Sequence, residues 1–409
     1  GATALVTGRV QRLGSTIVVA ADLVRTADGS QLWGERFQRP FSDIFTVQEQ
    51  IATSISDQLR LQLTTAERRK LAQRPTRRSD AYELYLKGRY HLNRRTADSA
   101  GPALAAFEQA VDVDPQYALA WAGIAEAHLW RRFLSSDADA SDELCVLAER
   151  AARKAAALDP ALADPHSTLG YLAMFRWDWR DAEREYRTAL ALNPDHANTH
   201  SWYSHLLMLM ARREEALLEI RAAIEIEPLS HSLNVSYAGL LWVMGRNEQA
   251  EAVAKKVVEL EPRFYFARWM MALASLARGH FEEAVTILER TVAECGQHPE
   301  LLGTLGYAYA RLDRKDEAMA ILAEIDAVSH GKDHSHLAEV CLGLGDISAA
   351  LRYAEHGFLK RGSINAILLT PQFAPLREDP RFEAMLARIG FPDPRQATFI
   401  PTTYQARAL

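Results

Sequence analysis

The chain has 409 residues, of which 48% are hydrophobic and 24% are charged, a composition typical of a globular protein. Its net charge of −6 disfavours nucleic acid as the main partner of this segment, because phosphate binding needs a basic surface. No apolar run reaches the roughly 18 residues that cross a bilayer, so no membrane partner is expected. The three cysteines form no CxxC pair, which argues against a disulfide framework or a zinc site and agrees with a cytoplasmic location, the periplasm being the alternative.

Residues 1–63 predict a small α+β segment of three strands and one helix. Val, Leu, Ile and Thr dominate Thr3–Leu13 and Thr16–Arg25, as they do in strands, and a third strand is expected at Gln31–Phe37. Apolar residues recur at helical spacing within Phe41–Leu63, where Ser42 is the candidate N-cap. Residues 64–80 follow as a basic linker, which we interpret as a solvated hinge rather than a phosphate-binding patch.

A regular sequence repeat dominates the rest of the chain. Three kinds of position keep one phase over four copies: a proline (Pro160, Pro194, Pro228, Pro262), a small residue (Ala182, Ala216, Ala250, Ala284) and a large apolar residue (Leu169, Tyr203, Tyr237, Met271). The proline ends a helix, and small residues such as Gly170 allow two helices to approach closely. This pattern, with its period of about 34 residues, resembles the tetratricopeptide repeat.

The resemblance implies a mostly α fold, an α-solenoid superhelix of about eight helical hairpins over residues 81–360. We expect an inserted loop around Arg131–Ser141 and a short slip of the repeat near Gly296–Pro299. A single hairpin cannot bury its apolar face, so stability requires the whole array.

In the tetratricopeptide family the first helix of each unit lines a concave face that holds a peptide. Carried over by position, that face is apolar and aromatic, and its candidate partner-binding residues are Tyr171, Met174, His205, Met208, Trp242, Trp269, Leu273 and Tyr307, with Ser167, Ser201 and Val235 beside them. For each residue, packing between hairpins is the open alternative. The implied partner is a protein or peptide, and an aromatic face of this kind also suits a homodimer.

The N-terminal segment resembles the second half of the TolB-amino-terminal-like (FlgO-like) domain. The matching strings are Gly8–Arg12, Thr26–Phe37 and Asp43–Ala52; Thr7 departs from the usual glutamate. We therefore expect the chain to be a fragment that begins inside this domain. The pairing with tetratricopeptide repeats resembles the C-terminal half of bacterial signalling proteins, whose N-terminal part is a class III nucleotide cyclase, a Ser/Thr kinase or a ToxR/CadC-type regulator.

The C-terminal end contains Pro371–Phe382, which resembles the closing segment of the same proteins. Residues 361–390 are expected to cap the last hairpin, and residues 391–409, with three prolines, to form an extended tail.

No catalytic signature is present: the sequence lacks GxxxxGK[ST], HExxH and GxSxG. Two groups of histidines, His196, His200 and His205 and then His330, His334 and His336, have spacings that occur in zinc sites. We interpret them as polar residues between repeats, since no acidic or cysteine ligand completes a set. No metal or cofactor is expected, and no enzyme activity within this chain.

The predicted function is a non-catalytic scaffold of a bacterial signalling or transcription-regulatory protein. The alternative is the regulatory region of a cyclase or kinase whose catalytic domain lies upstream. A third hypothesis, an envelope assembly factor, follows from the FlgO-like resemblance alone.

Overall fold

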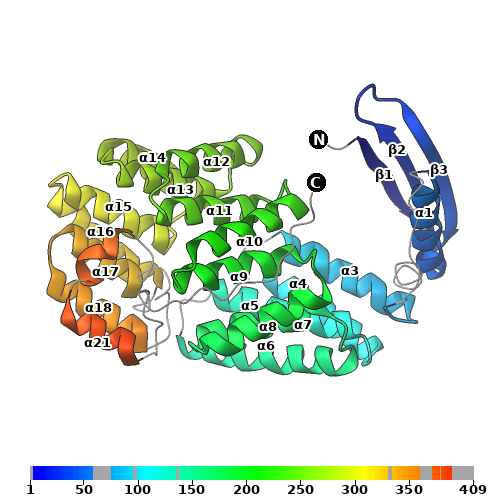
Figure 1. Cartoon of the computed structure of the whole chain (residues 1–409), viewed down its shortest axis with the longest axis horizontal. Helices are drawn as coiled ribbons and strands as arrows, with labels where there is room; N and C mark the ends of the chain where they lie inside the picture. Colours follow the sequence, from blue (N-terminus) through cyan, green and yellow to red (C-terminus); the bar gives the residue numbers. More distant parts are fainter. Residues whose placement is uncertain are drawn as a thin grey trace. The chain divides into compact units, whose positions relative to one another are not determined.

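A computed structural model describes residues 3–58, 75–94, 99–134, 138–329, 334–359, 371–377 and 379–388 (Figure 1). The chain forms two compact units. The first comprises Gly1–Trp130 with Ala157–Pro160, and the second comprises Arg131–Ala156 with Ala161–Leu409.

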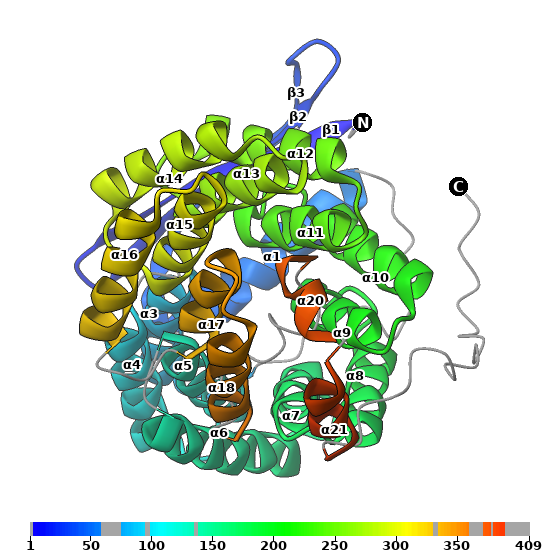
Figure 2. The same cartoon turned by 90° about the vertical axis from the view of Figure 1, so that its left-hand side faces the viewer.

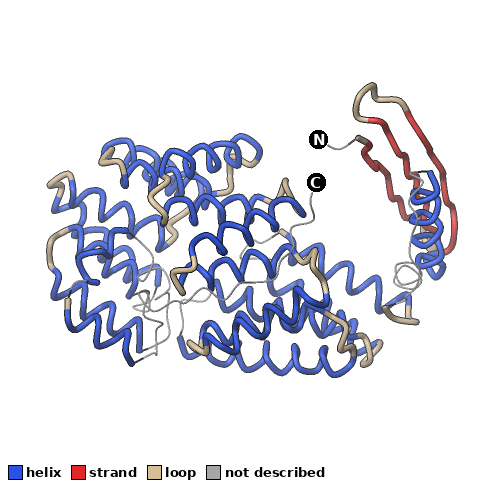
Figure 3. Tube along the Cα trace, in the orientation of Figure 1, coloured by secondary structure: helices blue, strands red, loops and turns tan. Residues whose placement is uncertain are grey.

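The first unit opens with the predicted three-stranded antiparallel sheet, in the order β1 (Ala4–Leu13), β2 (Thr16–Arg25), β3 (Gln31–Pro40) (Figure 3). A 3-10 turn and helix α1 (Ile44–Gln58) follow, and α1 packs on β3 and β2. Alternate residues of β2 are buried beneath it, as a sheet covered on one face requires.

Ser42 does not cap α1, contrary to expectation. Its hydroxyl instead donates to the Asp43 carboxylate at 3.0 Å, and the 3-10 turn Phe41–Asp43 has no side-chain cap. The misassignment arose because the helical pattern in the sequence begins before the α-helix itself does.

Three helices complete the described part of the first unit: α3 (Ser79–Asn93), α4 (Ala100–Val113) and α5, which begins at Ala118 and ends at Leu134 in the second unit. The fully buried Phe107 lies between two glycines, and a Cβ on Gly88 or Gly123 would come within 2.6 Å of its ring. The glycines therefore set how closely these helices approach.

The second unit is built from α6 (Ala138–Leu158) and six helical pairs. These are α7 (Ala163–Phe175) and α8 (Trp179–Leu192), α9 (Ala197–Leu209) and α10 (Arg213–Ile226), α11 (His231–Val243) and α12 (Asn247–Leu260), α13 (Tyr265–Ala277) and α14 (Phe281–Cys295), α15 (Pro299–Arg311) and α16 (Lys315–Ser329), and α17 (His334–Gly343) and α18 (Ile347–Leu359). With the four helices before α7, the described residues hold eight helical pairs in chain order, and the predicted α-solenoid is confirmed.

In Figure 2 helices α9, α11, α13 and α15 lie on the inner side of the coil and α10, α12, α14 and α16 on its outer side. We call the first helix of every pair its inner helix and the second its outer helix. The close approach expected at Gly170 is present: a Cβ there would lie 2.8 Å from the buried ring of Tyr186. Each pair also packs on the next, so that one hydrophobic core runs through the array.

The slip expected near Gly296–Pro299 is wrong. The outer helices from α8 to α16 begin in equal steps along the chain, and only α18 begins slightly before the next equal step would place it. Gly296, with φ of 106°, occupies the position at which the earlier units have proline. The phase of the repeat is therefore unchanged although the residue at this position differs. The irregularity lies one hairpin later.

The inserted loop expected at Arg131–Ser141 is also mostly absent. Helix α5 extends to Leu134, and α6 begins at Ala138. Helix α6 has 21 residues, whereas α14 and α16 have 15 residues each. The extra residues extend the two helices rather than form an excursion.

The second unit ends in a short 3-10 turn (Pro371–Phe373), α20 (Ala374–Arg377) and α21 (Pro380–Arg388). The turn contacts α17, and α20 contacts α18. Four apolar side chains of the turn, α20 and α21 join the core: Phe373, Leu376, Phe382 and Met385. Residues 391–409, the predicted tail, lie outside the described residues, as do residues 59–74 of the predicted linker.

Candidate partner-binding face

The inner helices place the candidate residues in two groups. Met174, Met208, Trp242 and Leu273 are at most 5% exposed and pack inside the array. The Trp242 indole N–H even donates to the carbonyl of Leu273, 3.2 Å away on the next inner helix. These four offer a partner no surface in this conformation.

Tyr171, His205, Trp269 and Tyr307 are only half-buried, and each comes from a different inner helix, α7, α9, α13 and α15. They are the part of the candidate set that a partner can reach. Of the neighbouring residues, Val235 is half-buried too, whereas Ser167 and Ser201 are buried.

Tyr171 belongs to an aromatic cluster on α7 and α9. Its ring centroid lies 4.8 Å from that of Phe175 and 4.8 Å from that of Trp202. The guanidinium of Arg132 lies over the Phe175 ring, 3.6 Å from its centre. Reasoning from the sequence missed Phe175 and Trp202, although Phe175 follows Tyr171 by four residues and so shares its helix face.

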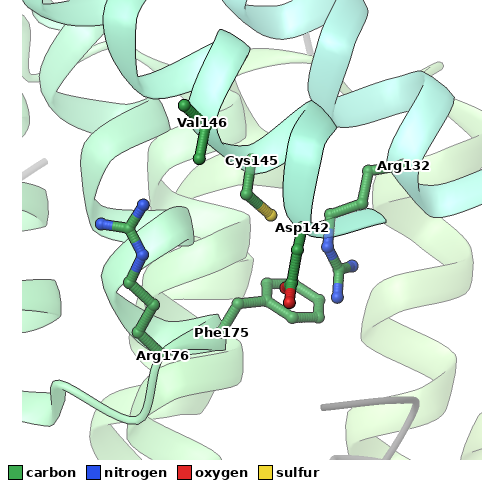
Figure 4. A pocket seen from close by; sticks show the side chains of 6 residues that line it. All are labelled: Arg132, Asp142, Cys145, Val146, Phe175 and Arg176. Carbon is green, nitrogen blue, oxygen red and sulfur yellow. The ribbon is translucent and has the colours of Figure 1, made fainter. Parts of the chain in front are cut away.

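A cavity of about 230 Å³ adjoins this cluster, lined by Arg132, Asp142, Cys145, Val146, Phe175 and Arg176 (Figure 4). The Cys145 thiol points into it, and burial raises the pKa of that thiol, so that Cys145 stays protonated and weakly nucleophilic. Arg176 is paired with Glu149. This chemistry does not favour catalysis by the thiol.

Trp269 is held in place by a buried hydrogen-bond chain. Its indole N–H donates to the Thr304 hydroxyl at 2.9 Å, and that hydroxyl donates to the Glu339 carboxylate at 3.1 Å. Thr304 and Glu339 are at most 4% exposed. The ring is therefore oriented before any partner binds.

His205 and Tyr307 are both uncharged at neutral pH. Burial lowers the pKa of His205 to about 4, and burial raises the pKa of Tyr307. The half-buried face consequently presents neutral aromatic groups, with no lysine or arginine among the candidate residues.

The histidines at four-residue spacing serve the repeat itself. His196 precedes α9 and its ring nitrogen accepts from the Thr199 N–H, which caps the helix. His200 is 1% exposed, with Nδ1 2.5 Å from Glu219 and Nε2 2.8 Å from the Pro194 carbonyl oxygen. No metal-binding cluster occurs among the described residues, and His330 lies outside them.

Both ring nitrogens of His200 thus face acceptors, which only the doubly protonated imidazolium can satisfy. Burial disfavours that charge, but the hydrogen bonds to Glu219 and to the Pro194 carbonyl outweigh it and raise the pKa of His200. The same place in the next repeat is taken by Asn234, which donates to the Pro228 carbonyl at 3.0 Å.

Two tetratricopeptide repeat family models match the chain, over residues 236–299 and 275–336. The chain contains tetratricopeptide repeats. Within the part that the structure describes, no helix has the length and apolarity needed to span a membrane.

Among curated proteins, "Putative adenylate cyclase 3" of Rhizobium meliloti (strain 1021) is 30% identical over 117 residues, which make up 29% of this chain and 20% of that protein. The matched region thus spans a fifth of that relative's length.

Among solved structures, a monomeric mutant of IFIT1 with m7Gppp-AAAA aligns over 76% of this chain and 75% of its own, with a TM-score of 0.50 and 15% identity. A tetratricopeptide repeat protein from Parabacteroides merdae ATCC 43184 aligns over 67% of this chain and 100% of its own, with a TM-score of 0.45 and 14% identity. At these identities the likeness concerns the fold alone.

Proposed function

We propose that this chain is a non-catalytic scaffold that binds a protein or peptide on the inner face of its helical repeat. The observation that carries the proposal is the set of half-buried neutral aromatics on four of the inner helices, above all Tyr171 and Trp269. Aromatic side chains bury much area at little cost in conformational entropy and dominate binding hot spots.

Site-specific photo-crosslinking in the native cell tests this proposal. A benzoylphenylalanine is placed at Tyr171, at Trp269 or, as a control, at Leu218, which is 65% exposed on the outer helix α10. We expect the same discrete adduct from Tyr171 and Trp269 and none from Leu218. Equal labelling at all three positions, or none at the inner two, contradicts an inner binding face.

A homodimer is the alternative occupant of this face. An adduct with twice the mass of the chain would identify it, whereas a heterologous partner gives another mass. The predicted cytoplasmic location, with the periplasm as the alternative, is read from the compartment in which adducts form.

We further propose that the scaffold works in a bacterial signalling protein. The 30% identity to a protein named as an adenylate cyclase supports this role, and so does the TolB-like pattern of Gly8–Arg12 and Thr26–Phe37. The second candidate function is accordingly the regulatory region of a nucleotide cyclase or kinase whose catalytic domain lies upstream.

The complete gene product decides between these roles. If the second candidate holds, the complete gene product forms cyclic AMP from ATP or phosphorylates a protein substrate. Deletion of residues 81–360 then changes the rate of that reaction or the response of that rate to the captured partner. If the complete gene product has neither activity, only the scaffold role remains.

A further inference from the structure

The start of helix α13 carries four half-buried aromatic side chains, Phe264, Tyr265, Phe266 and Trp269, which we call the α13 aromatic patch. Ring centroids lie 4.2 Å apart for Tyr265 and Phe266 and 6.3 Å apart for Phe266 and Trp269. Phe266 and Trp269 are three residues apart on one helix, so both rings lie on the same side of it.

The next inner helix, α15, and the residue before it hold this patch in place. Tyr265 stacks on His298, with ring centroids 4.1 Å apart and planes 9° apart, and its hydroxyl donates to the Glu300 carboxylate at 2.7 Å. Trp269 is held by the chain through Thr304 to Glu339. A patch ordered in advance loses little entropy when a ligand binds.

Two carboxylates adjoin the patch, and the exposed Arg263 precedes it. Glu300 stands half-buried in the first turn of α15, where it accepts from Tyr265, and the buried Glu339 ends the hydrogen-bond chain from Trp269. The basic neighbour on α13, Arg268, is 12% exposed and paired with Glu294. An aromatic face beside a carboxylate attracts cations, because the ring quadrupole and the carboxylate both favour positive charge within about 6 Å.

We propose that the α13 aromatic patch and Glu300 bind a lysine or arginine side chain of the partner, so that the inner face selects cationic apolar peptides. This inference rests on the proposed function and specifies its partner. It is the reverse of recognition by a basic clamp, which would select a carboxylate.

A selection from a random dodecapeptide display library tests the chemistry without a known ligand. The library is panned on the whole chain and counter-panned on Trp269→Leu, which removes the most strongly oriented ring. Enriched peptides are sequenced, and one is synthesised for titration at two salt concentrations against wild type, Glu300→Gln and the control Glu248→Gln, whose carboxylate is exposed on the outer helix α12.

We expect the enriched pool to be rich in Lys or Arg flanked by apolar residues. Glu300→Gln keeps an acceptor for Tyr265 but loses the charge, so it should lower the affinity for the chosen peptide about three- to thirtyfold. Glu248→Gln should leave that affinity unchanged. Replacing the peptide's Lys or Arg by Gln should lower the affinity of the wild-type protein by a similar factor. The same replacement should change the affinity of the Glu300→Gln variant little.

Two other outcomes contradict the inference in distinguishable ways. Enriched peptides without an excess of Lys or Arg, or with affinities indifferent to Glu300→Gln, overturn the cation site while the inner binding face stands. A library from which wild type enriches nothing over Trp269→Leu argues against the inner face itself, and the inference fails with it.

Discussion

His200 shows how one side chain joins neighbouring parts of the repeat through its charge. Its imidazolium bridges Glu219 of α10 and the carbonyl of Pro194, at 1% exposure. Asn234, one repeat later, donates to two backbone carbonyls, those of Pro228 and Ser230. The two residues therefore separate the neutral part of the interaction from the charged part.

We predict that His200→Asn removes a pH-dependent share of the stability. A histidine with a raised folded pKa stabilises fully below its unfolded value of about 6.5, and this contribution is lost as the pH rises through the folded pKa. At pH 6 the variant should be about 1–3 kcal/mol less stable than wild type. In urea unfolding the difference should shrink by pH 9; a difference that stays constant with pH means that the pKa of His200 is the same in the folded and unfolded states, and one that grows with pH means that His200 is neutral when folded.

The turn between paired helices carries a second residue-level signal. The residues with left-handed backbone there are Trp177, Ala211, Gly245, Gly279, Asp313 and Gly345, each two residues before its outer helix begins, with φ between 58° and 81°. Glycine adopts this conformation without the steric cost that a Cβ brings. Only three of these six turns have a glycine at this position.

Ala211→Gly should consequently stabilise the protein, by up to about 1 kcal/mol, because relief of the left-handed strain exceeds the added entropy of the unfolded chain. The matched change Gly245→Ala should destabilise it by about 1 kcal/mol. Thermal unfolding of both variants checks the pair, and the same sign for both would show that φ at this turn carries no energetic weight.

At the scale of elements, a buried ionic clasp links successive hairpins. Arg212, just before α10, has a side chain 7% exposed and donates to Glu183 of α8 at 2.7 Å and to Glu215 of α10 at 2.6 Å. Tyr203 of α9 donates to the same Glu183 at 2.9 Å. The group thus ties three helices together.

Arg212→Met should destabilise the array by about 3 kcal/mol, because it removes the buried cation that Glu183 and Glu215 share and leaves Glu183 with Arg187 alone. The control is Arg184→Met, whose side chain is 61% exposed beside Asp181 and which should cost less than about 1 kcal/mol. Urea unfolding at pH 7 measures both. Equal effects would mean that burial does not decide the strength of these pairs.

For the second unit as a whole, the C-terminal elements close the end of the core. Phe373, Leu376, Phe382 and Met385 are at most 5% exposed and belong to the same cluster as the last hairpin. A repeat array needs such an end, because the last apolar face otherwise meets water.

Removal of residues 371–409 should therefore expose α17 and α18, raise their amide hydrogen exchange and promote aggregation. Removal of residues 391–409 alone should change neither. Hydrogen exchange with mass spectrometry compares the two truncations with the full chain. Unchanged protection of α17 in the longer truncation would show that the last hairpin is stable without a cap.

The repeat period and the strand pattern were sufficient to predict the class of fold, the helical pairs and the three strands, because periodicity reports which face of an element is buried. The repeat also pointed to the inner helices as the place of a binding face. It did not separate Trp242, which is packed inside, from Trp269, which is half-buried, because both are aromatics on inner helices. Burial depends on the residues that the neighbouring hairpin brings.

The sequence by itself determined the repeat, its small and large core positions and the absence of familiar catalytic motifs. Only the tertiary structure decided the rest: the unbroken phase at Gly296, the helical form of the segment around Arg131–Ser141, the charge state of His200 and the carboxylate beside the α13 aromatic patch. The first group follows from local spacing along the chain. The second depends on contacts between residues up to 35 positions apart, whose chemistry no period of the sequence encodes.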